Sequence, residues 1–151
     1  MIRLGVNNIL RCYFLNKKNL KEIVRFILKS VGVFDANLSI VFATDNDVKR
    51  LNYLYRSERR PTDVLSFPMK EGKRLKGDST ILGDVVISID RAKKQAKRFD
   101  STFKKEIYLY IIHGILHLVG YSDEKPLSKE RMRKKEIEIL SALLSHLGSR
   151  L

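Results

Sequence analysis

The apolar positions of the chain recur with two periods, and each period predicts one kind of element. A spacing of three and four residues, typical of helices with one buried face, predicts helices over about 16–31, 44–55, 90–99, 101–119 and 128–147. Short runs rich in β-branched and aromatic residues predict strands at 38–43, 64–67 and 81–89, with an opening strand somewhere in 2–12. This alternation predicts an α/β (α+β) fold, in which helices pack on a small mixed sheet.

Polar residues at the ends of these segments predict where the helices begin. Asn16 can cap the first helix, because its short side chain accepts a hydrogen bond from a free backbone amide. Thr44 or Asp45 can cap the second helix, and Asp90 the third. Gly32 is expected to end the first helix. Two polar segments, 56–61 and 70–80, are expected to be loops.

The length and charge of the chain indicate how many domains it has and what kind of partner it binds. The 151 residues suit a single domain, which we expect to span 1–151. The chain has 30 Lys and Arg against 17 Asp and Glu, which gives a formal charge of +13. Such an excess favours a polyanionic partner, nucleic acid ahead of a membrane surface. A generally charged, solvated surface would explain many of these charges but not the surplus.

Cysteine usage and the absence of long apolar runs indicate the compartment. The one cysteine, Cys12, excludes an intramolecular disulfide and is expected to be a small buried residue in a reducing environment. The N-terminus lacks the basic start and sustained apolar stretch of a signal peptide. No apolar run approaches the ~20 residues that a membrane span needs. The sequence therefore predicts a soluble, cytoplasmic protein with no membrane partner.

The segment from His113 to Asp123 has the spacing H-x-x-x-H-x-x-G-x-x-D, which can hold a metal ion. Residues four apart lie on one helix face, so His113 and His117 can direct both imidazoles at one ion. Gly120 can end the helix in a left-handed conformation and bring Asp123 back as a third ligand. Three protein ligands and an open position for water are the pattern of a catalytic zinc site. The segment predicts a metal-dependent hydrolase.

Two alternatives weigh against this interpretation. The two histidines could be core residues with satisfied nitrogens, although burying two imidazoles in an apolar stripe is costly without partners. A zinc protease of the H-E-x-x-H type is a second alternative, but it needs a glutamate where this chain has Gly114. Peptide hydrolysis is therefore disfavoured. The remaining histidine, His146, is expected at the surface or at a helix end.

Basic, hydroxyl and carboxylate side chains lie around the start of the strand predicted at 64–67, which ends before Pro68. Arg56 is the strongest candidate for a bidentate hydrogen bond to a phosphate. The functional interpretation of this stretch is therefore a phosphate-binding surface. Thr62, Asp63 and Ser66 are candidate substrate-binding residues in the same stretch. The alternative is a turn fixed by proline and by local hydrogen bonds of Thr62 or Asp63.

Acidic residues and basic clusters elsewhere have simpler interpretations. Asp84, directly after Gly83, could orient a ligand histidine or hydrogen-bond the backbone at a bulge, and the bulge is slightly favoured. Glu136 and Glu138 are expected only to support the last helix. The clusters of Lys and Arg on predicted helices are most simply solvated helix faces. Because all are positively charged, they could also form a surface that binds along the phosphate backbone of a nucleic acid.

Four blocks of the chain together resemble the YbeY family, the bacterial rRNA maturation factors and single-strand-specific endoribonucleases. The blocks are Leu51-Asn52 with Arg56, TDVLSFP at 62–68, LGDVVIS at 82–88, and H-G-x-L-H-L-x-G-Y at 113–121. The resemblance covers most of the chain and implies a single zincin-like domain with zinc at the helix histidines. It further implies hydrolysis of single-stranded RNA, maturation of the small-subunit rRNA 3′ end, and contact with the ribosome. Arg56, His113 and His117 would be the catalytic residues.

The chain departs from the family pattern at the third metal ligand. The family motif usually continues Gly-Tyr-Asp-His, whereas this chain reads Gly120-Tyr121-Ser122-Asp123. Asp123 therefore stands in the third-ligand position, with Glu124 as a rival. An oxygen ligand widens the metal preference from zinc towards manganese or other divalent ions. The nucleophile is left open between water and the 2′-hydroxyl of the RNA.

Two other functions remain as alternatives to an endoribonuclease. One is a non-catalytic ribosome-binding or rRNA-binding factor with a structural metal, but structural zinc normally has four protein ligands. The other is a metalloprotease, which Gly114 disfavours. The sequence does not indicate an oligomeric state.

Overall fold

The computed structural model describes residues 1–56, 64–69 and 81–148, without the side chains of Leu10, Tyr55 and Arg56. The elements are β1 (Ile2–Asn7), a short turn η1 (Ile9–Arg11), α1 (Lys17–Ser30), β2 (Ala36–Ala43), α2 (Asp45–Arg56), β3 (Val64–Pro68), β4 (Ile81–Ser88), α3 (Ile89–Arg98), α4 (Phe103–Leu118) and α5 (Pro126–Gly148). The loop predicted at 70–80 lies outside the described residues. Of the loop predicted at 56–61, Arg56 belongs instead to α2, and 57–61 lie outside the described residues.

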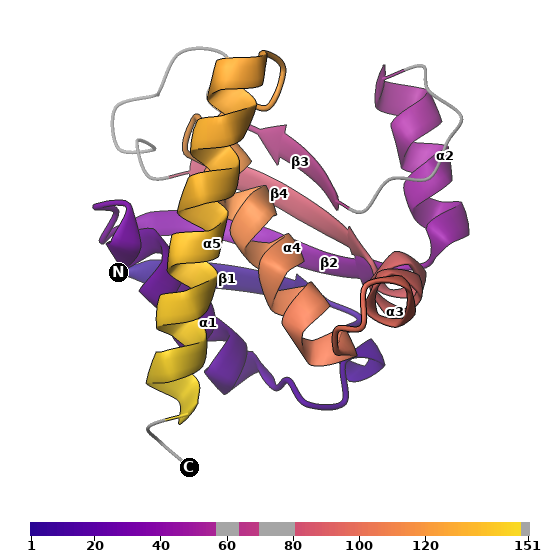
Figure 1. Ribbon diagram of the computed structural model, residues 1–151, viewed down its shortest axis with the longest axis horizontal. Coiled ribbons are helices and arrows are strands. Elements are labelled where there is room, and N and C mark those ends of the chain that lie inside the picture. Colours follow the sequence, from indigo (N-terminus) through magenta and orange to yellow (C-terminus); the bar gives the residue numbers. More distant parts are fainter. Residues whose placement is uncertain (57–63, 70–80, 149–151) are drawn as a thin grey trace.

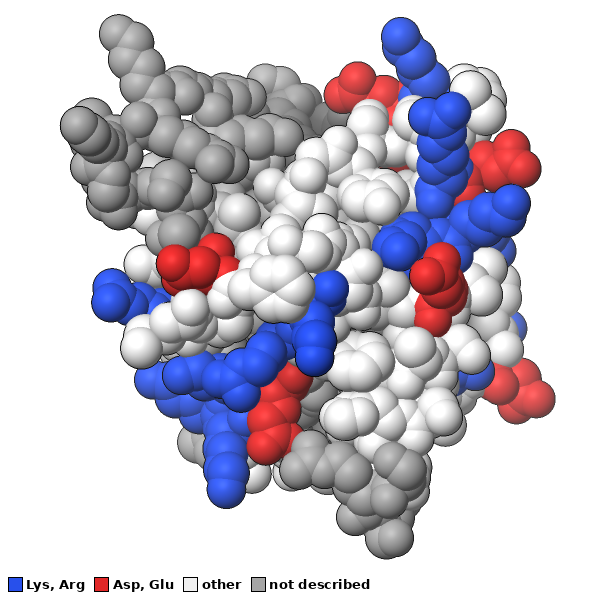
Figure 2. All heavy atoms as spheres, turned by 90° about the vertical axis from the view of Figure 1, so that its left-hand side faces the viewer, with Lys and Arg blue, Asp and Glu red and all other residues white. Residues whose placement is uncertain are grey.

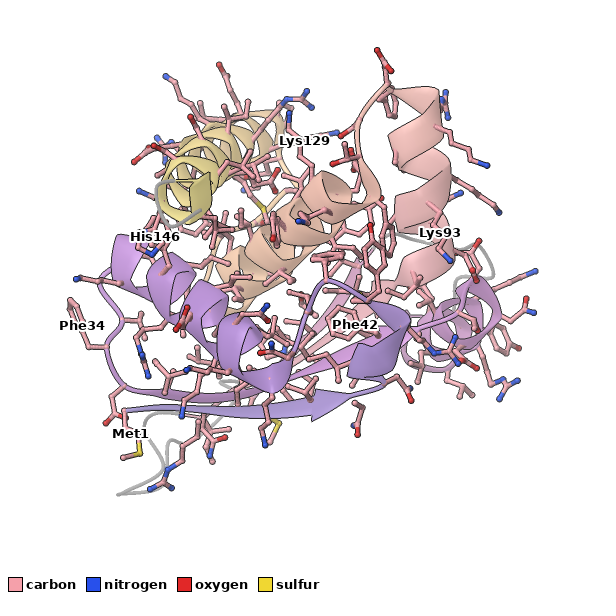
Figure 3. All side chains as sticks on the ribbon, turned by 90° about the horizontal axis from the view of Figure 1, so that it is seen from below. Met1, Phe34, Phe42, Lys93, Lys129 and His146 are labelled. Carbon is pink, nitrogen blue, oxygen red and sulfur yellow. The ribbon has the colours of Figure 1, made fainter. Side chains whose placement is uncertain are left out.

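The strands form a mixed sheet in the order β1-β2-β4-β3. β1 and β4 run parallel to β2, and the edge strand β3 runs antiparallel to β4. Because side chains alternate between the faces of a strand, the buried Leu38, Ile40 and Phe42 share one face of β2. Figure 3 shows Phe42 pointing from the sheet into the layer of helices. The predicted fold class is confirmed.

Three helices cover this buried face of the sheet. α1 contacts β1, α4 contacts β3 and β4, and α5 packs on α1 and α4, so that α4 lies between the sheet and α5 (Figure 1). The other face is covered in part by α2, whose Val48 and Leu51 pack with Leu65 and Val86. A helix held from both sides is a rigid support for side chains that must keep a fixed geometry.

The caps predicted for the first two helices are present. The Asn16 side chain accepts from the Asn19 amide at 2.8 Å, and the Asn19 side chain accepts from the Asn16 amide at 2.7 Å. At α2 the Thr44 hydroxyl accepts from the Asp47 amide at 3.2 Å, so Thr44 and not Asp45 is the cap. These bonds satisfy amides that have no partner within the helix.

The predicted cap of the third helix is wrong. Ser88, two residues before Asp90, caps α3 by accepting from the Arg91 amide at 3.1 Å. The Ser88 hydroxyl also donates to the Asp45 carboxylate at 2.7 Å. Asp90 instead accepts from the Asp45 amide at 2.8 Å. The beginnings of α2 and α3 are thereby tied together at the carboxyl ends of β2 and β4.

Replacing Ser88 with alanine should lower the free energy of unfolding by about 1–2 kcal/mol, because a buried cap and its bond to Asp45 are lost together. Urea unfolding measures this change. Ser145→Ala is the control, since Ser145 is exposed in α5 and its loss should change stability by less than about 0.5 kcal/mol. Equal values for the two variants would contradict the capping role.

Two smaller predictions are confirmed. Cys12 is buried, and burial raises the pKa of its thiol to about 12, so the thiol stays protonated and unreactive. His146 is exposed in the last turn of α5 and stacks on Phe26, with ring centroids 4.9 Å apart (Figure 3). None of the helices in the described part of the chain is both long and apolar enough to cross a membrane.

Candidate metal centre

α4 and the turn after it bring the two predicted histidines and the aspartate together. His113 and His117 lie one helical turn apart on α4. The helix ends at Leu118, and Gly120 follows with a φ of 109°, in the region that favours glycine. The chain then reverses, so that Asp123 faces both imidazoles. The predicted helix end at Gly120 is confirmed.

The three side chains have the spacing of ligands to one ion. The His113 Nε2 and His117 Nε2 atoms are 3.1 Å apart. The Asp123 carboxylate lies 3.6 Å from His117 Nε2 and 4.0 Å from His113 Nε2. Tetrahedral bonds of about 2.0–2.2 Å to zinc place their ligand atoms roughly 3.4 Å apart. His113, His117 and Asp123 therefore could hold a metal ion with little movement.

Asp123 rather than Glu124 completes this group among the described residues. The Asp123 side chain is 45% exposed, whereas those of His113 and His117 are 30% and 25% exposed. All three side chains are thus partly exposed, and the carboxylate is the most exposed of them. An ion held there would be reachable from solvent, which a catalytic ion requires.

Gly114 explains how α4 can lie so close to the sheet. A Cβ atom at this position would lie 2.4 Å from Val85 Cγ1 and 3.2 Å from Val64 Cγ1. A side chain at this position would therefore force at least the Val85 side chain to move. The Gly114 carbonyl also accepts a hydrogen bond of 3.2 Å from the hydroxyl of Ser66, which is buried in β3. Ser66 therefore holds α4 on the sheet, and its contact with a substrate stays a prediction.

Glu136 is a residue of the site that the sequence pattern did not indicate. Its carboxylate contacts Nδ1 of His113, the ring nitrogen that faces away from His117. The expectation that Glu136 only supports α5 is therefore wrong. One signal could have found it, because Glu136 has helical spacing with the buried Met132, Ile139 and Leu143. A carboxylate within an apolar stripe needs a polar partner on the facing element.

Asp84 lies on the opposite side of the sheet from the histidines. Because Val85 faces α4, the neighbouring Asp84 points to the other face, where it accepts a hydrogen bond from the Ser39 hydroxyl. It lines a cleft of about 480 Å³ with Asn7, Ser39, Val41, Leu51, Phe67 and Val86. The interpretation of Asp84 as a residue that orients a ligand histidine is wrong. The predicted bulge is present, since the register between β2 and β4 shifts just before Gly83, but Asp84 bonds there to the side chain of Ser39 and not, as predicted, to the backbone.

The remaining candidate residues precede β3. Thr62 and Asp63 lie outside the described residues, and so does the side chain of Arg56. The backbone of Arg56 closes α2. The roles of these three residues in substrate binding or catalysis stay predictions.

The excess of positive charge is distributed over several elements. Exposed basic residues include Lys17, Lys18, Arg25 and Lys29 of α1, Lys93, Lys94, Lys97 and Arg98 of α3, and Lys129, Arg131, Arg133 and Lys134 of α5. On the face that Figure 2 shows, Lys and Arg side chains stand in separate groups with acidic side chains beside them and uncharged surface between. The exposed basic residues of the described chain are therefore distributed over at least three helices.

Comparisons with known proteins agree on one family. A family model described as Endoribonuclease YbeY matches residues 11–144. A protein named Endoribonuclease YbeY from Persephonella marina is 39% identical over 95% of this chain and 88% of its own length. The protein of the same name from Pelotomaculum thermopropionicum is 42% identical over 78% of this chain and 79% of its own length.

A solved structure is similar along nearly the whole chain. It is the solution structure of TM1509 from Thermotoga maritima, which is 27% identical in sequence and superposes with a TM-score of 0.63. The match covers 99% of this chain and 93% of that chain. The arrangement of helices on the mixed sheet is therefore shared with an experimentally determined fold.

Proposed function

The chain belongs to the YbeY family of endoribonucleases, and from this we propose that it is a metal-dependent endoribonuclease specific for single-stranded RNA. The observation that carries the proposal is the group formed by His113, His117 and Asp123 on α4 and its following turn. We further propose that its substrate is the 3′ end of small-subunit rRNA and that it serves ribosome maturation and quality control in the cytoplasm, in contact with the small subunit.

The proposed cofactor is one zinc ion held by His113, His117 and Asp123. The donor set of two imidazoles and one carboxylate suits zinc and also admits manganese and other divalent ions. When bound, such an ion can lower the pKa of a water molecule or polarise a phosphoryl oxygen. The three side chains fix its position, and the exposed side of Asp123 leaves access for a phosphate.

In the proposed mechanism Arg56 binds the scissile phosphate and stabilises the charge that builds on its oxygens. Thr62, Asp63 and Ser66 are proposed to contact the RNA on either side of that phosphate. Gly114 supplies no side chain to accept a proton beside His113, which separates this centre from the H-E-x-x-H peptidases. Attack by the 2′-hydroxyl would leave a 2′,3′-cyclic phosphate, and attack by water a linear phosphate, so analysis of product ends distinguishes the two.

The test is cleavage of single-stranded ribosomal RNA by the metal-loaded protein, compared with the same protein after chelation and with a fully paired RNA. Cleavage that requires metal and a single strand supports the proposal. RNA binding without cleavage would favour the alternative, a ribosome-associated factor with a structural metal. Hydrolysis of casein by the pure protein would favour a metalloprotease.

Arg56→Ala should reduce kcat/KM for RNA by about 10²–10³-fold, the range for loss of one group that stabilises transition-state charge. The affinity for zinc should not change, because Arg56 is not among the proposed ligands. Arg50→Ala is the matched control, since Arg50 is an exposed arginine of the same helix. Unchanged cleavage by the Arg56 variant would remove this residue from the mechanism.

A further inference from the structure

We propose that Glu136 is a positioning residue of the metal centre, which fixes the ring of His113 so that its Nε2 lone pair faces the ion. The inference rests on the proposed metal-dependent function, because it concerns the same three ligands. It assigns to α5 a direct part in a centre whose ligands all come from α4 and the turn after it.

The two nitrogens of the His113 ring have different neighbours. Nδ1 contacts the Glu136 carboxylate, whereas Nε2 lies 3.1 Å from His117 Nε2 and 4.0 Å from the Asp123 carboxylate. The nitrogens point away from one another across the ring, so Glu136 and Asp123 cannot both reach one ion bound at Nε2. Glu136 therefore acts on the centre through His113 and is not a fourth ligand.

The chemistry of the contact determines where the proton of His113 lies. An ionised carboxylate can only accept hydrogen bonds, so Nδ1 of His113 must be the donor to Glu136. A neutral imidazole carries one proton, and Nε2 is then left with the free lone pair that a metal requires. The same bond holds the ring at one rotation about its side-chain torsions.

The surroundings of Glu136 favour this role over a purely structural one. Its side chain is 14% exposed and belongs to the face of α5 that buries Met132, Ile139 and Leu143. Replacing a buried polar pair with well-packed apolar residues is often neutral or stabilising, so stability alone does not explain a carboxylate here. Glu138, two residues later, is 69% exposed and pairs with Lys135 at 3.3 Å on the surface.

The first measurement is zinc affinity, by competition of the purified protein with a chromophoric chelator. Glu136→Ala should weaken zinc binding by about 10–100-fold, the usual effect of removing a partner of a metal-bound histidine. Glu136→Gln keeps an acceptor oxygen and should fall between wild type and alanine. Glu138→Gln is the matched control and should bind zinc like the wild type.

A second readout needs neither metal nor activity. The ¹⁵N shifts of the neutral His113 ring, followed on metal-free wild-type protein through a pH series, should show the proton on Nδ1. In Glu136→Gln the amide can also donate, so the proton should redistribute towards Nε2. This measurement covers the case in which the alanine variant does not fold.

The outcomes separate this inference from the proposed function. Zinc affinity of Glu136→Ala equal to that of the wild type, or a wild-type His113 protonated on Nε2, would overturn the positioning role while leaving the ribonuclease proposal intact. A wild-type protein that binds no divalent ion would overturn the proposed function, and the ring shifts would still decide whether Glu136 sets the proton of His113. A loss of stability in Glu136→Ala with unchanged zinc affinity would assign Glu136 to packing alone.

Discussion

We expect His117→Ala to lose cleavage of single-stranded RNA while keeping its fold. Among the described residues, removing this imidazole leaves two of the three proposed ligands, His113 and Asp123, and two ligands bind a divalent metal far more weakly than three. A bound metal supplies several kcal/mol of transition-state stabilisation, so the rate should fall by at least about 10²-fold. Parallel measurement of RNA cleavage and zinc content on identically purified proteins tests this.

His146→Ala is the control for the histidine substitution. His146 is exposed on α5 and stacks on Phe26, apart from the metal centre, so its loss should leave cleavage and zinc content unchanged. Wild-type rates in the His117 variant would indicate a contaminating nuclease and refute the site. Thermal unfolding of both variants would verify that a lost activity is not a lost fold.

Gly83→Ala should destabilise the protein by about 3 kcal/mol or more. Gly83 has a φ of 134°, which residues with a side chain rarely adopt, and an added Cβ would lie 2.1 Å from the Phe67 carbonyl oxygen of β3. Relief of this clash requires β3 to separate from β4. Because Ser66 of β3 binds the Gly114 carbonyl, the displacement should also loosen α4. Chemical denaturation followed by circular dichroism measures the change.

Gly148→Ala is the matched glycine control. Among the described residues, and apart from its chain neighbours and the backbone of its own helix, no atom lies within 4 Å of the position that its Cβ would take at the end of α5. The free energy of unfolding of the Gly148→Ala variant should stay within about 0.5 kcal/mol of the wild-type value. If Gly83→Ala is as stable as Gly148→Ala, then the bulge of β4 can accommodate a side chain. The close approach of β3 would then not restrict position 83 to glycine.

Local signals in the sequence were sufficient to predict that the three candidate ligands converge and where several helices end. His113 and His117 are one turn apart, so their convergence follows from helix geometry alone. The Asn16 cap is equally local, since its hydrogen bonds reach only three residues along the chain. The α3 cap was misplaced because Ser88 and Asp90 are both good capping residues, and the choice between them depends on Asp45 from another element.

Contacts between distant elements could not be predicted from a single sequence. Glu136 is 23 residues from His113, and its role depends on how α5 packs across α4. The face to which Asp84 points depends on the register shift between β2 and β4, and a shift of one residue moves a side chain to the other face. That Gly114 has no side chain to act as a base follows from the sequence, but its close approach to Val85 depends on tertiary packing.

The pairing of β1 with β2 has a consequence for how the chain folds. Register pairs such as Ile2 with Ala36 and Leu38 with Gly83 join segments far apart in the sequence, and parallel pairs of this kind form slowly because long loops must close first. The three proposed metal ligands all lie on α4 and the turn after it. An ion present during refolding can therefore meet its ligands before the sheet is complete, and refolding rates should depend on zinc at a stage when α5 has not yet docked.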